Sequence, residues 1–171
     1  MLPMDCHTHT GISPDGTGTV AGHVAQAKKL GLPLIDTDAY IVQQEGKSIP
    51  DIFAQDGEPY FREKETAAIQ ALCQKKAVIS CGGGAMIKPE NAAYAREHGI
   101  VVLLDESFDT CYQRIKGDTN RPIVQRSTKE ELHALFDQRA SIYRAHATCA
   151  VPGGVSPEQM AQRIIQAVKE H

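Results

Sequence analysis

The sequence predicts an α/β fold in which helices cover a parallel sheet. Short apolar runs alternate along the chain with longer stretches of helical period, as expected for strands that are buried on both faces. No repeat, low-complexity tract or flexible linker interrupts this alternation. A chain of 171 residues has room for one domain of ordinary size, so we expect residues 1–171 to form a single domain with one site.

Four of the apolar runs are predicted strands, and the helices are expected between and after them. The strands are predicted at Leu34–Asp36, Ala77–Cys81, Ile100–Asp105 and Thr148–Val151. Start and stop residues such as Pro, Ser and Gly bound the predicted helices, which are Thr19–Leu30, Glu58–Lys75, Pro89–His98, Ser107–Lys116, Lys129–Ala145 and Ser156–Lys169.

A fifth, central strand is expected within residues 1–15, although this stretch fits the pattern less well. A strand covered on both faces is normally apolar. Here the stretch carries the polar residues Asp5, His7, Thr8, His9 and Thr10. The first segment is therefore the anomaly of the sequence.

Charge and composition exclude several classes of protein. There are 18 lysines and arginines and 21 aspartates and glutamates, which gives a net charge of −3 with no block of like charge, so we expect no nucleic-acid partner. No apolar run approaches the roughly 18 residues of a membrane span, and the N-terminus lacks the pattern of a secretory signal. Five scattered cysteines indicate reduced thiols rather than a disulfide framework. We expect a cytoplasmic protein.

A run of glycines is the most specific chemical signal. Gly82, Gly83 and Gly84 directly follow an apolar strand, at the end of a parallel sheet where ligands dock and where backbone N–H groups are exposed. The alternative is a flexible turn, which needs only one or two glycines. We therefore favour a binding role.

Asp36 and Asp38 end another predicted strand. Alternation along a strand would direct both carboxylates to the same side, where one could handle a metal or a proton while the other holds a hydroxyl. A helix N-cap is the competing role for either aspartate.

The arginines are weak signals when each is taken alone. Arg62 lies inside a long predicted helix, where an i,i+4 charge partner is the commoner role. Arg114 precedes the polar loop 117–122, which contains Arg121, and Arg139 lies on the next helix. Loops with arginine often close over phosphates, although surface arginines are more common.

Together these pieces resemble the shikimate kinase family of small P-loop kinases. The resemblance runs from Gly31 to about Val168 and rests on the order and spacing of six segments, which are Gly31–Asp38, Gly57–Glu65, Cys81–Gly84, Arg121-Pro122, Arg139 with Tyr143, and Ser156–Glu158. It implies a three-layer P-loop NTPase-type fold with a five-stranded parallel sheet in the order 2-3-1-4-5. Residues of about 114–126 would form a lid, and the protein would act as a monomer.

The resemblance also implies a site for shikimate and ATP. Asp38, Arg62, Gly82–Gly84 and Arg139 would bind shikimate, with the arginines on its carboxylate and Asp38 on its hydroxyls. Other residues would serve the phosphate side: Asp36 would contact Mg²⁺ through water, Arg121 would stabilise the transferring phosphoryl group, and Arg114 would lie near adenine. Asp38 and Arg121 would be catalytic.

The phosphate-binding loop departs from the family pattern. Counting back from Gly31 places the G-x-x-G-x-G-K-[ST] loop on residues 13–20, where Gly16 and Gly18 match. Thr19 stands in place of the lysine, and Val20 stands in place of the hydroxyl that binds Mg²⁺. Loss of one such donor typically costs about 10²–10³ in rate. We expect weak or absent kinase activity, and a non-catalytic shikimate-binding protein is the alternative.

The first segment has a second resemblance. Residues Met4–Gly18, and plausibly those through Leu32, are similar to the opening of the PHP-family metal-dependent phosphoesterases, which include histidinol phosphatases. His7 and His9 would face one side of a strand and could share Zn²⁺ or Mn²⁺. A PHP barrel needs more chain than 171 residues provide. The leading interpretation is thus a shikimate kinase body with an atypical segment over residues 1–32, and a phosphoesterase is the third candidate.

Overall fold

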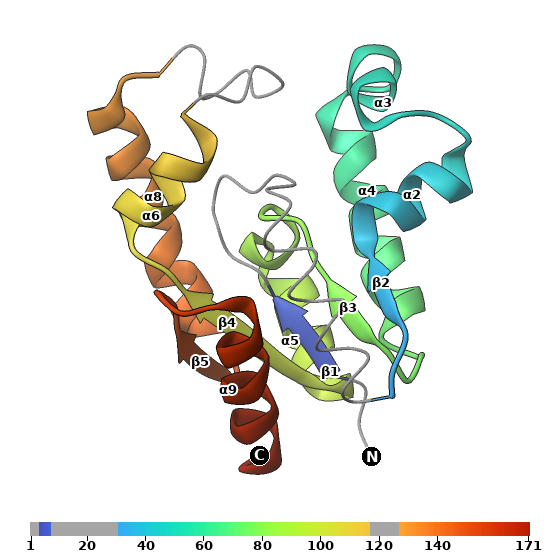
Figure 1. Cartoon of the computed structure of the whole chain (residues 1–171). Coiled ribbons are helices and arrows are strands. Elements are labelled where there is room, and N and C mark those ends of the chain that lie inside the picture. Colours follow the sequence, from blue (N-terminus) through green and yellow to red (C-terminus); the bar gives the residue numbers. More distant parts are fainter. Residues whose placement is uncertain (1–3, 8–30, 117–126) are drawn as a thin grey trace.

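A computed structural model describes residues 4–7, 31–116 and 127–171 of the chain (Figure 1). The elements in chain order are β1 (Met4–His7), β2 (Leu34–Asp36), α2 (Thr37–Glu45), α3 (Ile49–Gln55), α4 (Gly57–Leu72), β3 (Val78–Ser80), the 3₁₀ helix η1 (Ala85–Ile87), α5 (Pro89–His98), β4 (Ile100–Asp105), α6 (Phe108–Ile115), α8 (Lys129–His146), β5 (Cys149–Pro152) and α9 (Pro157–Lys169).

The five strands form one parallel sheet in the order β2-β3-β1-β4-β5, which is the order that the family resemblance implies. β1 lies in the centre, where Cys6 is in register with Ser80 of β3 and with Val102 of β4. The central strand expected within residues 1–15 is therefore Met4–His7. Thr8, His9 and Thr10 lie outside the described residues.

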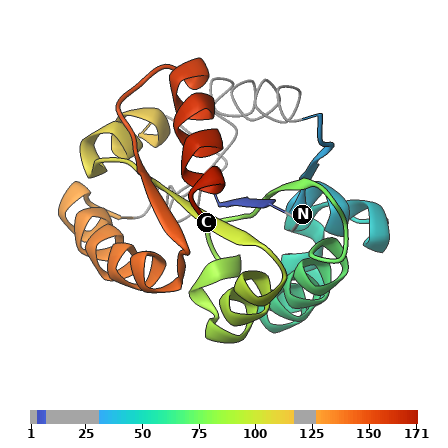
Figure 2. The same cartoon turned by 90° about the horizontal axis from the view of Figure 1, so that it is seen from below.

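Alternation along the strands builds a core on each face of the sheet. Ile79 and Val101 face one side, where they pack with residues of α4 and α5. Their neighbours Val78 and Val102 face the other side and pack with Ile164 of α9. Figure 2 shows α9 on the opposite side of the sheet from α4 and α5. Helices on both faces of a parallel sheet make the three-layer α/β architecture.

Two helical lobes stand beyond the carboxyl ends of the strands (Figure 1). One consists of α2, α3 and the first half of α4, and its core includes Ile41, Ile52 and Phe61. The other consists of α6 and α8 around Phe108 and Leu132. The edge of the sheet where ligands of such folds bind therefore faces the space between two separately packed lobes.

Most of the described elements lie where the sequence predicts them, and three of the described elements are not among the predicted ones. Those three are α2, α3 and η1. Gly57 has a φ of +84°, in the left-handed region that favours glycine, and this lets α3 pass directly into α4. The predicted helix Thr19–Leu30 and residues 117–126 of the predicted lid lie outside the described residues. Among the described helices, none has both the length and the apolar character needed to cross a bilayer.

Candidate functional site

Asp36 and Asp38 do not share one strand, so the expectation of two carboxylates related by strand alternation is wrong. β2 ends at Asp36, which caps α2 by accepting a hydrogen bond of 2.9 Å from the Ala39 N–H to its Oδ1. Asp38 lies in the first turn of that helix. The competing N-cap role is therefore confirmed for Asp36, and helical geometry rather than alternation places Asp38.

The glycine turn after β3 packs closely against both of these elements. A Cβ on Gly82 would lie 3.3 Å from Oδ1 of Asp38, and a Cβ on Gly84 would overlap Nη1 of Arg62. None of the three glycines has a positive φ, so at Gly82 and Gly84 the lack of a side chain, rather than an unusual backbone, is what the turn requires. The turn brings Asp38 of α2 and Arg62 of α4 to one place.

The alternative of a flexible turn does not fit the contacts of this segment. Three side chains hydrogen-bond to carbonyl groups between Gly83 and Met86: Tyr143 Oη donates to Gly83 at 2.6 Å, Asn91 Nδ2 donates to Ala85 at 2.9 Å, and His146 Nδ1 lies 2.6 Å from the Met86 oxygen. Asn91 belongs to α5, whereas Tyr143 and His146 belong to α8. Side chains from two helices thus hold the segment in place.

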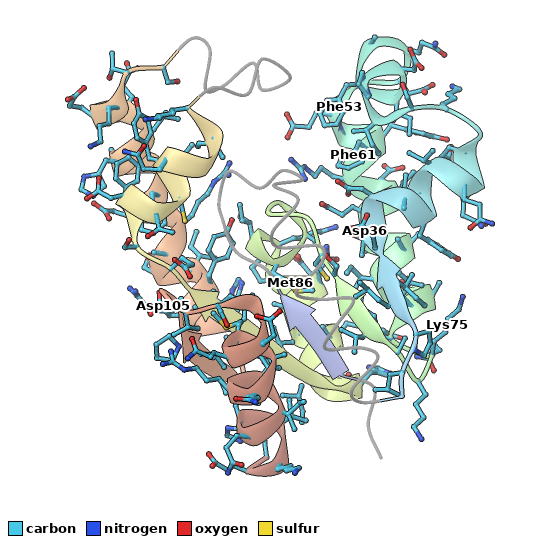
Figure 3. The ribbon with its side chains drawn as sticks, in the orientation of Figure 1. Asp36, Phe53, Phe61, Lys75, Met86 and Asp105 are labelled. Atoms are coloured by element: carbon cyan, nitrogen blue, oxygen red, sulfur yellow. The ribbon has the colours of Figure 1, made fainter. Side chains whose placement is uncertain are left out.

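Arg62 is held by two glutamates of its own helix. Its Nε and Nη2 donate to Oε1 of Glu58 at 3.2 and 3.0 Å, and its Nη1 donates to Oε2 of Glu65 at 3.0 Å. The i,i+4 pair expected for this arginine is present, joined by an i,i+3 pair. Figure 3 labels Phe61, next to Arg62 on α4, and Asp36 at the end of β2.

Glu65 is the buried member of this group, with only 2% of its surface exposed. Burial raises the pKa of its carboxyl above the usual value, and Arg62 offsets only part of this increase. The carboxylate of Asp38 acts in the same direction as burial. The Arg62 guanidinium is therefore paired with Glu58 and Glu65, and the charge of Asp38 acts on Glu65.

Arg139 approaches the same place from α8. Its side chain hydrogen-bonds to Tyr143, and the charges of Arg62 and Glu65 also act on this tyrosine. Burial raises the pKa of the Tyr143 hydroxyl above its usual value despite both arginines. Asp38 of α2, Arg62 of α4, Arg139 of α8 and the glycine turn thus lie near one another at the carboxyl end of the sheet.

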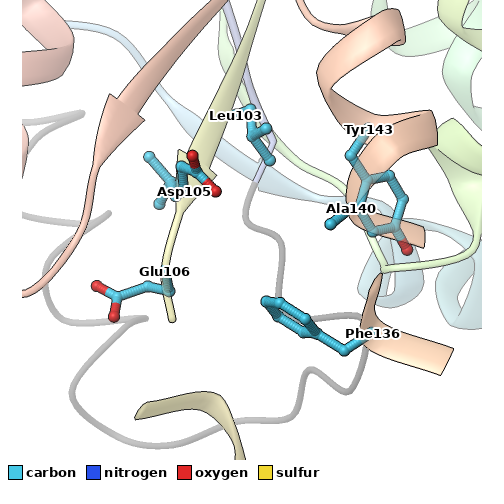
Figure 4. A pocket seen from close by; sticks show the side chains of 7 residues that line it. Leu103, Asp105, Glu106, Phe136, Ala140 and Tyr143 are labelled. Atoms are coloured by element: carbon cyan, nitrogen blue, oxygen red, sulfur yellow. The ribbon is translucent and has the colours of Figure 1, made fainter. Parts of the chain in front are cut away.

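A hollow lies beside this group, between the end of β4 and α8 (Figure 4). It encloses about 300 Å³, including space open to solvent, and its lining consists of Leu103, Leu104, Asp105, Glu106, Phe136, Ala140 and Tyr143. Figure 4 shows Phe136 and Tyr143 on α8 opposite Asp105 and Glu106 on the β4 side. Tyr143 therefore borders both the hollow and the glycine turn.

Asp36 is the residue expected to contact Mg²⁺ through water, and the structure describes its surroundings. Asp36 is exposed at the end of β2, and its Oδ1 accepts a hydrogen bond from the Ala39 N–H at the start of α2. Because β2 ends at this residue, its carboxylate lies at the edge of the sheet where phosphates bind in such folds. Among the described residues, no three His, Cys, Asp or Glu side chains are grouped to hold a metal ion. The described part of the chain therefore provides no site for Zn²⁺ or Mn²⁺.

Several expected site residues cannot be placed. The described part of the structure does not include His9, Gly16, Gly18, Thr19, Val20 and Arg121, nor the side chains of His7 and Arg114. Conversely, the sequence reasoning missed Glu58, Glu65, Asn91 and His146. The only signal for any of them was the i,i+3 and i,i+4 spacing of the two glutamates around Arg62.

Comparison with known proteins gives one consistent result. The profile of the shikimate kinase family matches residues 16–169. A shikimate kinase of Synechococcus elongatus is 36% identical over 156 residues, which are 90% of this chain and 82% of that protein. A shikimate kinase of Persephonella marina is 36% identical over 160 residues, 93% of this chain and 96% of that protein.

Solved structures agree with the sequence comparison. The shikimate kinase from Acinetobacter baumannii in complex with shikimate matches with a TM-score of 0.84 at 31% identity, covering 99% of this chain and 94% of that one. The shikimate kinase from Aquifex aeolicus matches with a TM-score of 0.82 at 30% identity, covering 97% and 96%. The family profile extends down to residue 16, within the stretch that resembles PHP phosphoesterases, and the comparisons give that second resemblance no support.

Proposed function

The chain belongs to the shikimate kinase family, and from this premise we propose that it transfers the terminal phosphoryl group of ATP to a hydroxyl of shikimate, forming ADP and shikimate 3-phosphate. The observation that carries the proposal is the convergence of Asp38, Arg62, the glycine turn and Arg139 at one end of the sheet. This end is where ligands bind in parallel α/β sheets.

Two arginines would bind the carboxylate of the substrate. A guanidinium presents its N–H groups as a planar fork that matches the two oxygens of a carboxylate. Arg62 is half-buried, and it is held by Glu58 and Glu65. Glu58 is the exposed partner, so an incoming carboxylate can replace it while Glu65 keeps the guanidinium in place.

Asp38 would act on the reacting hydroxyl. Its half-buried carboxylate lies against Gly82, and a carboxylate there accepts a hydrogen bond and orients the hydroxyl oxygen toward the phosphoryl group. Transfer of the phosphoryl group relies mainly on such positioning and on compensation of negative charge. We assign that compensation to Arg121, with Arg114 near adenine.

The ATP side carries the departure from the family pattern. Mg²⁺ bound with ATP neutralises phosphate charge, and Asp36 would hold it through water. Thr19 and Val20 stand where the family has the phosphate-binding lysine and the hydroxyl that binds Mg²⁺. These two replacements favour the second candidate function, a shikimate-binding protein with little or no kinase activity. Gly16 and Gly18 would still offer backbone N–H groups to phosphate.

Three further parts of the proposal concern organisation. We propose that residues 1–171 work as a single domain, that residues 114–126 form its lid, and that the protein acts as a monomer. The resemblance to the family supports each of them. The third candidate, a metal-dependent phosphoesterase that uses His7 and His9, is supported only by the spacing of those two histidines.

Titration calorimetry separates the candidates. We expect shikimate to bind the full chain, and we expect neither tight binding of Zn²⁺ or Mn²⁺ nor metal-dependent cleavage of a phosphomonoester such as p-nitrophenyl phosphate. Absence of shikimate binding would contradict both kinase-derived functions. Hydrolysis that depends on added metal and is lost in the variant His7→Ala/His9→Ala would instead support the phosphoesterase.

A further inference from the structure

Tyr143 joins two parts of the site through a single oxygen atom. Its hydroxyl donates a hydrogen bond of 2.6 Å to the carbonyl of Gly83, and the side chain of Arg139 hydrogen-bonds to the same tyrosine. A guanidinium has only donors, so Arg139 donates and the phenolic oxygen accepts. The chain of bonds therefore runs from Arg139 to Tyr143 and on to the glycine turn.

The surroundings keep this arrangement in one state. Only 5% of the Tyr143 surface is exposed. Burial raises the pKa of its hydroxyl, so the proton that it donates to Gly83 is retained at neutral pH. The bonds from Asn91 to the Ala85 carbonyl and from His146 to the Met86 carbonyl hold the segment that follows the acceptor Gly83. The oxygen thus occupies a defined position relative to the glycine turn.

Arg139 gains an orientation from this oxygen. Arg139 lies one helical turn before Tyr143 on α8. A flexible arginine side chain loses rotamer freedom when it binds a ligand, whereas one that is already held loses less. Because a carboxylate is bound through the plane of the guanidinium, the direction of that plane affects affinity.

We propose that Tyr143 is a positioning residue, which sets the plane of the Arg139 guanidinium relative to the glycine turn and so increases the affinity of the site for a carboxylate substrate. This inference rests on the proposed function, because the carboxylate in question is that of shikimate. The tyrosine acts through Arg139. It also makes the anchored turn and the carboxylate-binding arginine one connected unit.

The test begins with the variant Tyr143→Phe, which keeps the ring that lines the hollow together with Phe136 and removes only the hydroxyl. We expect the Kd for shikimate, measured by calorimetry on the full chain, to rise about tenfold, which corresponds to about 1.4 kcal/mol. Tyr94→Phe is the matched control. It also removes a tyrosine hydroxyl with a hydrogen bond of 2.8 Å, the one from Gln74 on the α5 side of the sheet, and it should leave the Kd unchanged.

A second background shows whether the effect passes through Arg139. Arg139→Lys keeps the positive charge but replaces the planar fork by a rotating ammonium group, whose donors need no fixed plane. In this background the additional change Tyr143→Phe should raise the Kd by less than about twofold. A general loss of structure would instead weaken binding equally in both backgrounds.

The outcomes separate this inference from the proposed function. If the wild-type chain does not bind shikimate, the proposed function fails and the inference fails with it. If the wild type binds and Tyr143→Phe binds equally well, only the inference is overturned. The inference is also overturned if Tyr143→Phe raises the Kd by the same factor in the wild-type and in the Arg139→Lys background, because the tyrosine would then act independently of the guanidinium plane.

Discussion

The carboxylate of Glu65 lies 3.0 Å from Nη1 of Arg62 and belongs to an almost fully buried residue, whereas the arginine side chain that it holds is 39% exposed. One partner is thus fixed in the protein interior and the other reaches into the site. The pair presents a positive group at a defined place while its anchor stays out of contact with solvent. This relationship leads to different predictions for the buried and the exposed glutamate.

Replacing the buried Glu65 should change how the melting temperature of the protein depends on pH. Burial raises the pKa of Glu65 above 4.5, so the folded state holds this proton more tightly than the unfolded chain does. Its contribution to stability is therefore present in acid and is lost as the pH rises through the folded-state pKa. Glu65→Gln removes this dependence. We expect the melting temperature of Glu65→Gln minus that of the wild type to increase from about pH 4.5 to about pH 7.

Scanning calorimetry at a series of pH values measures this difference. Glu63→Gln, an exposed glutamate of the same helix, is the control and should show a smaller dependence. A difference that decreases with rising pH would mean that the ion pair with Arg62 outweighs burial.

Replacing the exposed glutamate should improve substrate binding. Glu58 is 61% exposed, so its pair with Arg62 adds only about 0–1 kcal/mol to stability. It nevertheless occupies Nε and Nη2, which a substrate carboxylate would need. We expect Glu58→Gln to lower the Kd for shikimate by up to about fivefold, measured by calorimetry. Weaker binding would show that Glu58 orients Arg62 rather than competing with the substrate.

A methyl group on Gly84 should displace Arg62 without unfolding the protein. The added Cβ would lie 2.8 Å from Cζ of Arg62 and closer still to Nη1, and the end of an arginine side chain can move aside. We expect Gly84→Ala to raise the Kd for shikimate at least about tenfold with little change in melting temperature. Gly82→Ala, whose Cβ would lie 3.3 Å from Asp38 Oδ1, should have the smaller effect. Equal and unchanged Kd values would contradict the packing described for the turn.

Removal of either arginine should abolish detectable shikimate binding. Each of Arg62→Ala and Arg139→Ala removes a charge-assisted contact to the carboxylate, worth roughly 1.5–3 kcal/mol. Asp38→Asn should weaken binding as well. Arg96→Ala is the control, because Arg96 is exposed and donates to the Ala145 carbonyl, away from the glycine turn. Unchanged affinity in both arginine variants would mean that the family's site does not map onto these residues.

Restoring the phosphate loop should increase turnover. Thr19→Lys would place a positive charge on the phosphates, and Val20→Ser would provide a hydroxyl for Mg²⁺. We expect the double variant to raise turnover by at least about 10². Each change alone should do less, and the two effects should be coupled, because each leaves one function of the loop missing. If the wild type forms ADP at a measurable rate and the double variant binds shikimate but is no faster, the cause of the low rate lies outside Thr19 and Val20.

The sequence predicts the elements around the sheet well because their signals are local. Strands Leu34–Asp36 and Ile100–Asp105 and helix Pro89–His98 have the predicted bounds, since apolar runs and the residues Pro89 and Gly99 mark their ends. Helix α2 was missed because only Thr37 and Ile41 of its residues are buried, which gives no clear helical period. The start of α3 does have a local signal, which is the N-cap residue Ser48 followed by Pro50 in the first turn.

The site was predicted through the resemblance, but its supporting contacts were beyond sequence reasoning. The helical spacing of Phe61, Ala68 and Leu72 puts Glu65 on the buried face of α4, but what this face packs against is set by distant parts of the chain. Tyr143 and His146 each hydrogen-bond to a carbonyl group 60 residues away, a separation that no spacing rule covers. Strand alternation misplaced Asp38 because β2 passes into α2 without a loop. Long-range packing therefore decides which polar residues become anchors.

A coupled assay of ADP release with ATP, Mg²⁺ and increasing shikimate tests the central claim most directly. The account predicts ADP formation that depends on shikimate and saturates with it, that is slow in the wild type and faster in Thr19→Lys/Val20→Ser, and that is lost with Arg62→Ala. Formation of ADP at the same rate with and without shikimate, or none in either the wild type or the double variant while both bind shikimate, would contradict a kinase function.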